Sequence, residues 1–396
     1  MPIVIRHQMQ TYPGLEPAIG RTRETPVEAP EKVPKYSSFL AIVLSVIGIA
    51  SCSGTPPAAH TPAFVYAANN GSNDVSAYTV TPSSGALTAV GDSPYLAGSA
   101  PVAIAADPSG KFVYVANVGS DNVSAYAINA ASGALTEVPG SPFATPASPF
   151  SVTVDPKGRF AFVGVGAAGV LAYTIDPSSG ALALITGSPF ASGAGAVAVD
   201  PSGRFLYATA FNLNNISAFA IKSSSGVLTP VPGSPFTAGV GNNPLGLVVD
   251  PKGQFLYVGN TLDGTISAFT INAVDGTLAP TSGSPFPTGV DPRSVCVDPS
   301  GRFLFVGTFG DGRVSGYTID ASGGLTPIGG SPFAVGAGIL GVAVDPSAKF
   351  LYVADNSPGS VRALSIGATG TLTAINGSPF AAGMGTEAIV VTGKIR

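Results

Sequence analysis

The sequence has no tryptophan, and only two of its 396 residues are histidines and two are cysteines. Both histidines, His7 and His60, precede the repeats described below, which excludes a Ser-His-Asp or Cys-His catalytic arrangement and a histidine-based metal site within those repeats. Cys52 and Cys296 fall in different segments, so no disulfide framework is expected. Charged residues make up 10% of the chain and the net charge is −4, so the sequence lacks the basic patch of a nucleic-acid-binding protein.

The chain instead contains one pattern repeated seven times. The pattern runs Ser-Pro-aromatic, an apolar run, Asp-Pro, Phe with alternating apolar residues, and Val-Ser-x-aromatic or a variant of it. Its marker phenylalanine recurs every 45–50 residues, at Phe64, Phe112, Phe160, Phe205, Phe255, Phe303 and Phe350. A period of this length is typical of a propeller or solenoid.

Each repeat divides into four short strands. In the repeat around Phe303, strands are expected at 294–297, 303–306, 314–319 and 325–328, joined by Asp-Pro and glycine-containing turns. Four antiparallel strands repeated seven times predict an all-β, seven-bladed β-propeller. The first repeat lacks its first strand, and the C-terminal run 387–391 aligns with that missing strand. We therefore expect the C-terminal strand to pair into the first blade and close the ring.

The N-terminal region has a different composition. Residues 1–32 are interpreted as disordered or as a misassigned start, 33–52 as a lipoprotein-type signal segment, 53–62 as a linker and 63–396 as the propeller. The apolar run 39–50 has the length of a secretory signal and is too short to span a membrane. Ile-Ala-Ser-Cys at 49–52 resembles a lipobox, which predicts lipidation of Cys52 and a periplasmic or cell-surface location, anchored to a bacterial membrane by that lipid. A secreted protein without the lipid is the alternative.

Residues that recur in every blade are expected to be structural. The repeated Asp-Pro aspartates are assigned to turns, and the basic residue after each turn to the solvated surface. The position five residues before each Asp-Pro aspartate, here called the channel position, differs between blades. It is occupied by Val102, Phe150, Gly195, Leu245, Arg293, Leu340 and, by alignment in the last strand, Glu387.

Arg293 and Glu387 are the two charged residues at the channel position. In a propeller this position lies where the innermost strands enter the central channel, so both side chains are candidates for the channel mouth. Asp291 lies just before Arg293 and is a candidate ligand-binding residue. The alternative is an ordinary pair of surface charges.

A second set of polar residues is expected in loops on the same face. Its candidate ligand-binding members are Asn69, Asn117, Asn260 and Asp355. Asparagine and aspartate also suit turns. No cofactor is expected, although oxygen ligands of this kind also suit a calcium ion. Cys296 aligns with small apolar residues of other repeats and is expected to be a buried thiol.

The repeat resembles that of the seven-bladed lactonase family, which includes 6-phosphogluconolactonases and cycloisomerases, and is similar to YVTN-type propeller repeats. The resemblance rests on Phe-Val-Tyr-Val-Ala-Asn at 112–117, Asn-Val-Ser-Ala-Tyr at 122–126, Gly-Ala-Leu-Thr at 133–136 and Val-Asp-Pro-Lys-Gly at 154–158. It implies a site at the channel mouth that uses arginine, glutamate and histidine. Arg293 and Glu387 match two of these residue types by location, and no histidine is available for the third.

Two functions are therefore considered. The first is a binding or scaffold module with the lactonase-family fold, which presents the channel mouth to a small molecule, glycan or protein. The alternative is a lactone hydrolase in which Arg293 binds the substrate or stabilises the oxyanion and Glu387 acts as general base. The protein is expected to be a monomer that contacts the membrane only through the lipid on Cys52.

Overall fold

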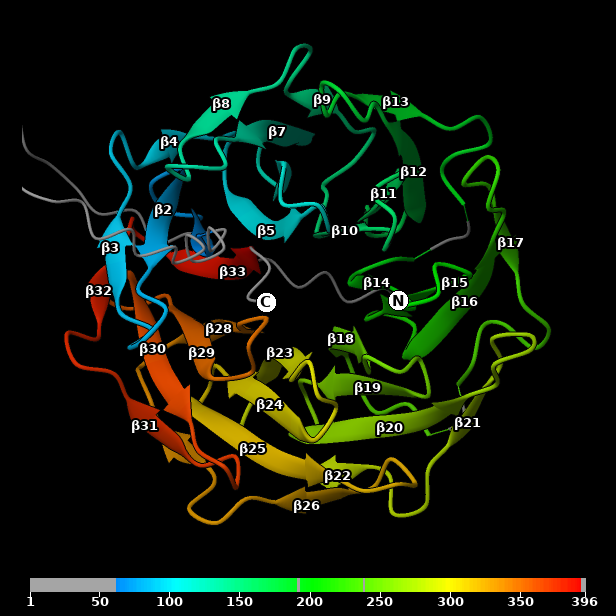
Figure 1. Cartoon of the computed structure of the whole chain (residues 1–396). Coiled ribbons are helices and arrows are strands. Elements are labelled where there is room, and N and C mark those ends of the chain that lie inside the picture. The colour runs from blue at the N-terminus through cyan, green and yellow to red at the C-terminus, as the bar shows by residue number, and fades with distance from the viewer. Residues whose placement is uncertain (1–61, 191–192, 238, 393–396) are drawn as a thin grey trace, which may run out of the picture. The chain divides into compact units, whose positions relative to one another are not determined.

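The computed structural model describes residues 62–190, 193–237 and 239–392. These residues form seven antiparallel sheets arranged as the blades of a propeller (Figure 1), which confirms the predicted fold class. No helix in this part of the chain is long and apolar enough to cross a membrane. The N-terminal extension, the signal segment with Cys52 and residues 53–61 of the linker lie outside the described residues.

The first two strands of each blade form its inner half. The innermost strands of blades 1 to 7, in that order, are β33 (Thr386–Thr392), β5 (Pro101–Ala106), β10 (Ser151–Val154), β14 (Val197–Val199), β18 (Pro244–Val249), β23 (Pro292–Val297) and β28 (Ile339–Val344). The second strands are β1 (Phe64–Asn69), β6 (Phe112–Asn117), β11 (Phe160–Gly164), β15 (Phe205–Ala210), β19 (Phe255–Asn260), β24 (Phe303–Thr308) and β29 (Phe350–Asp355).

The outer half of each blade contains the third and fourth strands. The third strands are β2 (Asp74–Val80), β7 (Asn122–Ile128), β12 (Val170–Ile175), β16 (Asn215–Ile221), β20 (Thr265–Ile271), β25 (Arg313–Ile319) and β30 (Ser360–Ile366). The fourth strands are β3 (Leu87–Ala89), β8 (Leu135–Glu137), β13 (Leu182–Leu184), β17 (Leu228–Pro230), β21 (Leu278–Pro280), β26 (Leu325–Pro327) and β31 (Leu372–Ala374).

The Ser-Pro-aromatic segment adds a feature that the sequence analysis missed. In five blades it forms a two-residue strand that pairs with the third strand, namely β4 (Tyr95–Leu96), β9 (Phe143–Ala144), β22 (Phe286–Pro287), β27 (Phe333–Ala334) and β32 (Phe380–Ala381). In every blade the serine hydroxyl accepts a hydrogen bond from a backbone N–H of the third strand, as Ser93 does from Ala77 at 2.8 Å. The recurrence of this tripeptide therefore has a structural cause.

The ring is closed by strands from both ends of the propeller, as predicted. Strand β33 pairs antiparallel with β1, from Phe64 opposite Thr392 to Asn69 opposite Thr386. A second contact crosses the same junction, where the Tyr352 hydroxyl of blade 7 donates to the Gly85 carbonyl of blade 1 at 2.9 Å. This pairing removes the free sheet edge that an open array would leave.

The hydrophobic core lies between neighbouring blades rather than at the centre of the ring. Seven clusters of buried side chains in the described residues each combine two adjacent blades. Phe64 of blade 1, for example, packs against Gly133 of blade 2. A Cβ added to that glycine would lie 2.4 Å from the Phe64 ring, and its φ of +77° also favours glycine.

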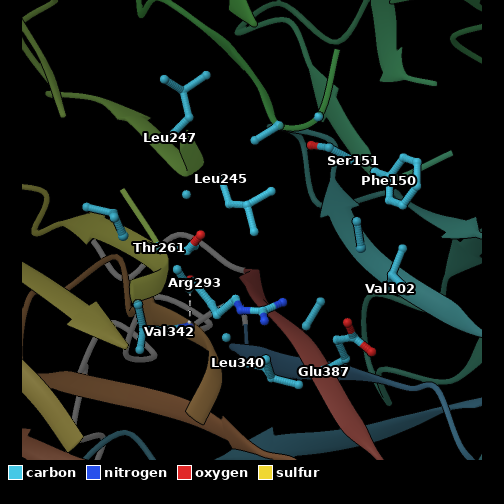
Figure 2. A pocket seen from close by; sticks show the side chains of 18 of the residues that line it. Val102, Phe150, Ser151, Leu245, Leu247, Thr261, Arg293, Leu340, Val342 and Glu387 are labelled. Atoms are coloured by element: carbon cyan, nitrogen blue, oxygen red, sulfur yellow. Dashed lines mark hydrogen bonds between the residues drawn. The ribbon is translucent and has the colours of Figure 1, made fainter. Parts of the chain in front are cut away.

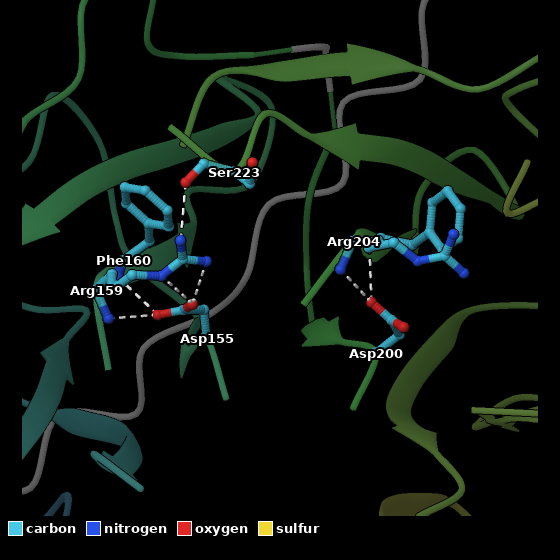
Figure 3. A network of polar contacts seen from close by, with 7 residues as sticks. Asp155, Arg159, Phe160, Asp200, Arg204 and Ser223 are labelled. Carbon is cyan, nitrogen blue, oxygen red and sulfur yellow. Dashed lines mark hydrogen bonds and ion pairs between the residues drawn. The ribbon is translucent and has the colours of Figure 1, made fainter. Parts of the chain in front are cut away.

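The Asp-Pro aspartates are turn residues, as expected. The buried Asp155 accepts hydrogen bonds from the backbone N–H groups of Arg159 and Phe160 (Figure 3). The basic residue after the turn does more than was expected. Arg159 pairs with Asp155 at 3.0 Å and donates to the Ser223 carbonyl of the next blade at 2.8 Å. Arg204 and Arg302 likewise reach carbonyl groups of the following blade, so these arginines link blades.

Candidate functional site

A cavity of about 970 Å³ lies among the starts of the innermost strands. All seven channel-position residues line it: Val102, Phe150, Gly195, Leu245, Arg293, Leu340 and Glu387. The residues that the repeat alignment places at equivalent positions of the seven blades thus line one cavity. Asp291 also lines the cavity.

A β-bulge lies at each of the two charged channel positions. In β23, Pro292 is opposite Thr308 and Ser294 is opposite Gly307, which leaves Arg293 as the extra residue. In β33 the same shift leaves Glu387 as the extra residue between Thr386 and Ala388. A bulge places two residues against one on the partner strand and redirects a side chain, and such features are over-represented next to active sites.

Arg293 is held in place by two neighbours. Its Nε and Nη2 atoms donate to the two carboxylate oxygens of Asp291 at 2.7 and 2.9 Å, and its guanidinium lies 5.5 Å from the centre of the Phe309 ring. Asp291 adopts a left-handed backbone conformation with φ of +56°. A guanidinium group has five N–H donors, so the Nη1 hydrogens and one Nη2 hydrogen remain for a ligand.

Glu387 occupies the same side of the cavity (Figure 2). Burial raises the pKa of this carboxyl to about 7, and the nearby positive charge of Arg293 only partly opposes that effect. Among the described residues, no hydrogen bond or ion pair holds the Glu387 carboxylate, and it is not in direct contact with Arg293. The carboxyl is therefore available to a ligand and is divided between its two protonation states near neutral pH.

The other four predicted ligand-binding residues lie outside the cavity lining. Asn69, Asn117, Asn260 and Asp355 are fully buried at the ends of second strands. The amides of the three asparagines donate to side chains at the start or middle of the third strand. Asp355 pairs with Arg362 at 2.7 Å. The structure thus places these side chains in the internal hydrogen bonding of the blades.

Two other predicted features concern metal and thiol chemistry. The described residues contain no cluster of three or more histidine, cysteine, aspartate or glutamate side chains placed to bind a metal ion. Cys296 packs against the cluster between blades 6 and 7, and burial raises the pKa of its thiol to about 12. At neutral pH this thiol is protonated and a poor nucleophile.

An aromatic wall that the repeat pattern did not predict lines another side of the cavity. Phe150 of blade 3 and Phe211 of blade 4 form an edge-to-face pair with ring centres 5.9 Å apart, and both line the cavity. Phe211 follows the second strand of its blade, where the other blades carry asparagine, valine, threonine or phenylalanine. The signal was therefore present in the repeat alignment as another position that varies between blades.

Comparison with known proteins agrees with this architecture. A family model described as "Lactonase, 7-bladed beta-propeller" matches residues 58–148, 185–291 and 284–387. No curated protein sequence matches the chain significantly.

Solved structures show the same fold at low sequence identity. A putative 6-phosphogluconolactonase from Bacteroides fragilis superposes with a TM-score of 0.73 at 20% identity, covering 85% of this chain and 100% of its own. A putative 6-phosphogluconolactonase from Bacteroides uniformis gives 0.72 at 18% identity, with 84% and 99% covered. The periplasmic gluconolactonase of Pseudomonas aeruginosa gives 0.72 at 18% identity, also with 84% and 99% covered. At these identities the similarity concerns the fold alone. The family model spans most of the ring, and the chain belongs to the lactonase family of seven-bladed β-propellers.

Proposed function

We propose that the protein hydrolyses a lactone in the central cavity, with Glu387 as general base and Arg293 as the group that binds the carbonyl oxygen. The observation that carries this proposal is that one side of a closed ring holds two groups. One is a carboxyl with a pKa of about 7 and no partner among the described residues, and the other is a guanidinium that keeps free donors. A general base works best when its pKa lies near the working pH. Membership of the lactonase family supports the same reaction class.

The reaction follows from the roles of these two groups. The ionised Glu387 takes a proton from a water molecule as the water oxygen attacks the lactone carbonyl carbon. The negative charge that develops on the carbonyl oxygen is stabilised by N–H donors of Arg293. When the ring C–O bond breaks, the leaving alkoxide takes the proton back from Glu387. The products are a hydroxy acid and a regenerated carboxylate.

Asp291 acts as a positioning residue in this scheme. Its two hydrogen bonds hold the guanidinium plane, and the Phe309 ring supports that plane from another direction. Because the ring contains no histidine, Glu387 has to serve as base for the attack and as acid for the departure.

A ligand-binding module without catalysis is the second candidate. It is favoured by the largely apolar lining of the cavity, where Val102, Phe150, Leu245 and Leu340 occupy four of the seven channel positions. Such a protein would hold its ligand between Arg293 and Glu387 without turnover.

The two functions are separated by assaying the purified full-length protein on a panel of γ- and δ-lactones. Lactonase activity predicts that Glu387→Gln and Arg293→Ala each lower kcat/KM by roughly 10²–10⁴-fold, the usual contribution of a general base or of an oxyanion donor. Glu137→Gln and Arg313→Ala are matched controls outside the cavity lining and should retain activity. Binding of lactones without turnover by the wild type would favour the second candidate. Full activity in Glu387→Gln would contradict the proposed base.

We also propose an extracytoplasmic, lipid-anchored location. The lipobox-like sequence ending at Cys52 supports it, and a Pseudomonas protein of the same fold is described as periplasmic. Mass spectrometry of the membrane fraction should find a lipidated Cys52 at the mature N-terminus, and Cys52→Ser should move the protein to the soluble fraction. Retention of residues 1–51 in the mature protein would contradict the anchor.

A further inference from the structure

The charges of the cavity are poorly suited to a phosphorylated sugar. Its ionisable lining residues are Asp291, Arg293 and Glu387, and no lysine or second arginine lines it among the described residues. The single guanidinium is already paired with a carboxylate. A phosphate monoester carries about −1.5 to −2 charges at pH 7. It would therefore meet two acidic groups and only one, already compensated, positive charge.

The neutral polar side chains of the lining are also engaged within the wall. Ser151 and Ser294 accept hydrogen bonds from the backbone N–H groups of Val197 and Val342, at 3.2 and 3.1 Å. The Thr261 hydroxyl lies within hydrogen-bond distance of two oxygens of Asn243. These bonds use acceptor capacity of both serines and of Asn243 and the hydroxyl hydrogen of Thr261, which reduces the partners left for a polyhydroxylated substrate, whose buried hydroxyls need hydrogen bonds.

The side of the cavity formed by blades 3 to 5 has no charged side chain in the part of the chain that the structure describes, and it exposes large apolar side chains to solvent. Phe150 is 41% exposed and Leu262 is 76% exposed, although both line the cavity. A second cavity of about 190 Å³ shares Phe211 with the central one. Among its described lining residues Asn212 has the one polar side chain, and the others are glycine, alanine, phenylalanine and leucine. The apolar surface therefore continues from the central cavity past Phe211.

The charged side chains that line the cavity are thus confined to one side of the ring. Arg293 of blade 6 and Glu387 of blade 1 flank Leu340 of blade 7, whereas Phe150 lies on another side of the cavity (Figure 2). A substrate that satisfies both sides has a small polar head and an apolar substituent.

We infer, on the basis of the lactonase function proposed above, that the substrate is an uncharged lactone with an alkyl or aryl substituent. The lactone ring lies between Arg293 and Glu387, and the substituent extends along Phe150 and Phe211.

The test is the dependence of kcat/KM on substituent length. The purified full-length protein is assayed on γ-lactones with unbranched alkyl chains of increasing length, and on glucono-δ-lactone and 6-phosphogluconolactone. Burial of one methylene group contributes about 0.8 kcal/mol. This corresponds to an increase of about fourfold in kcat/KM per added methylene, until the apolar surface is filled. The alkyl lactones should exceed 6-phosphogluconolactone.

The variant Phe150→Asn should flatten this chain-length dependence, because it replaces the aromatic ring that contacts the substituent with a polar amide. Leu96→Asn is the control, because Leu96 is 84% exposed and does not line the cavity. Preference for 6-phosphogluconolactone, or an unchanged chain-length dependence in Phe150→Asn, would overturn the inferred substrate class and leave the lactonase proposal intact.

A wild type that hydrolyses no lactone would overturn the proposed function itself. The apolar side is then tested separately by calorimetry with alkyl-substituted lactams, which resist hydrolysis. Affinity that rises with chain length and falls in Phe150→Asn would support the apolar subsite, and affinity independent of chain length would overturn it.

Discussion

Replacing Glu387 by glutamine should stabilise the protein at high pH, and this effect can be measured without a substrate. Burial raises the pKa of the Glu387 carboxyl from 4.5 to about 7. Because one pKa unit corresponds to 1.36 kcal/mol, this rise of about 2.5 units amounts to about 3 kcal/mol. This is the free energy by which the folded protein is destabilised when Glu387 is ionised.

The sign follows from proton linkage. Below about pH 4.5 the carboxyl is protonated in both the folded and the unfolded state. Between about pH 4.5 and 7 the unfolded chain has lost a proton that the folded protein keeps, so the free energy of unfolding falls as the pH rises. Above about pH 7 Glu387 is ionised in both states, and its titration lowers the free energy of unfolding no further. Glu387→Gln has no such proton and should lack this part of the pH dependence.

Urea unfolding of both proteins at pH 4.5 and pH 8 measures the difference. The advantage of Glu387→Gln over the wild type should grow by about 3 kcal/mol between these two pH values. Glu137→Gln, which changes the exposed glutamate of β8, is the control and should behave like the wild type. If the difference in unfolding free energy between the wild type and Glu387→Gln is the same at pH 8 as at pH 4.5, the carboxyl is well solvated. Glu387 would then not have the near-neutral pKa that its proposed role as general base requires.

Three further predictions concern the ring. Phe64→Ala should lower the free energy of unfolding by about 3–5 kcal/mol in urea titrations, because Phe64 fills the space between blades 1 and 2; a loss below about 1 kcal/mol would contradict that packing. A chain ending at Gly385 lacks β33 and should show a much lower melting temperature, and an unchanged melting curve would refute closure by this strand. Cys296 should resist iodoacetamide at pH 8 until the protein is unfolded, since burial raises its pKa to about 12, as peptide mass spectrometry can check; rapid labelling of the folded protein would contradict its burial.

The repeat made much of the fold predictable. The expected strands around Phe303 match β23 to β26 within two residues at each end. The two-residue strands such as β27 were missed because their pairing is set by a third strand some twenty residues earlier in the chain. The blade-linking contacts of Arg159 and Arg204 were missed because their partners lie more than sixty residues away.

The candidate site was only partly predictable. Comparison between repeats singled out Arg293 and Glu387, which both line the cavity, because their charges depart from the repeated scaffold. The same comparison did not exclude Asn69 or Asn117 from the candidate site. The sequence around a polar residue near a loop is the same whether its side chain faces a cavity or, as here, is buried against a neighbouring strand. Their hydrogen bonds to side chains on the adjacent strand become visible only in the structure.

The sequence alone determined the blade number, the strand order within a blade and the closure of the ring, because these depend on a period and on alternation that local residues set. The tertiary structure decided what the channel contains. Arg293 and Glu387, at bulges in β23 and β33, line one cavity, and the burial of Glu387 there raises its pKa. Burial and electrostatic environment arise from seven blades meeting around an axis, and no single segment of the chain specifies them.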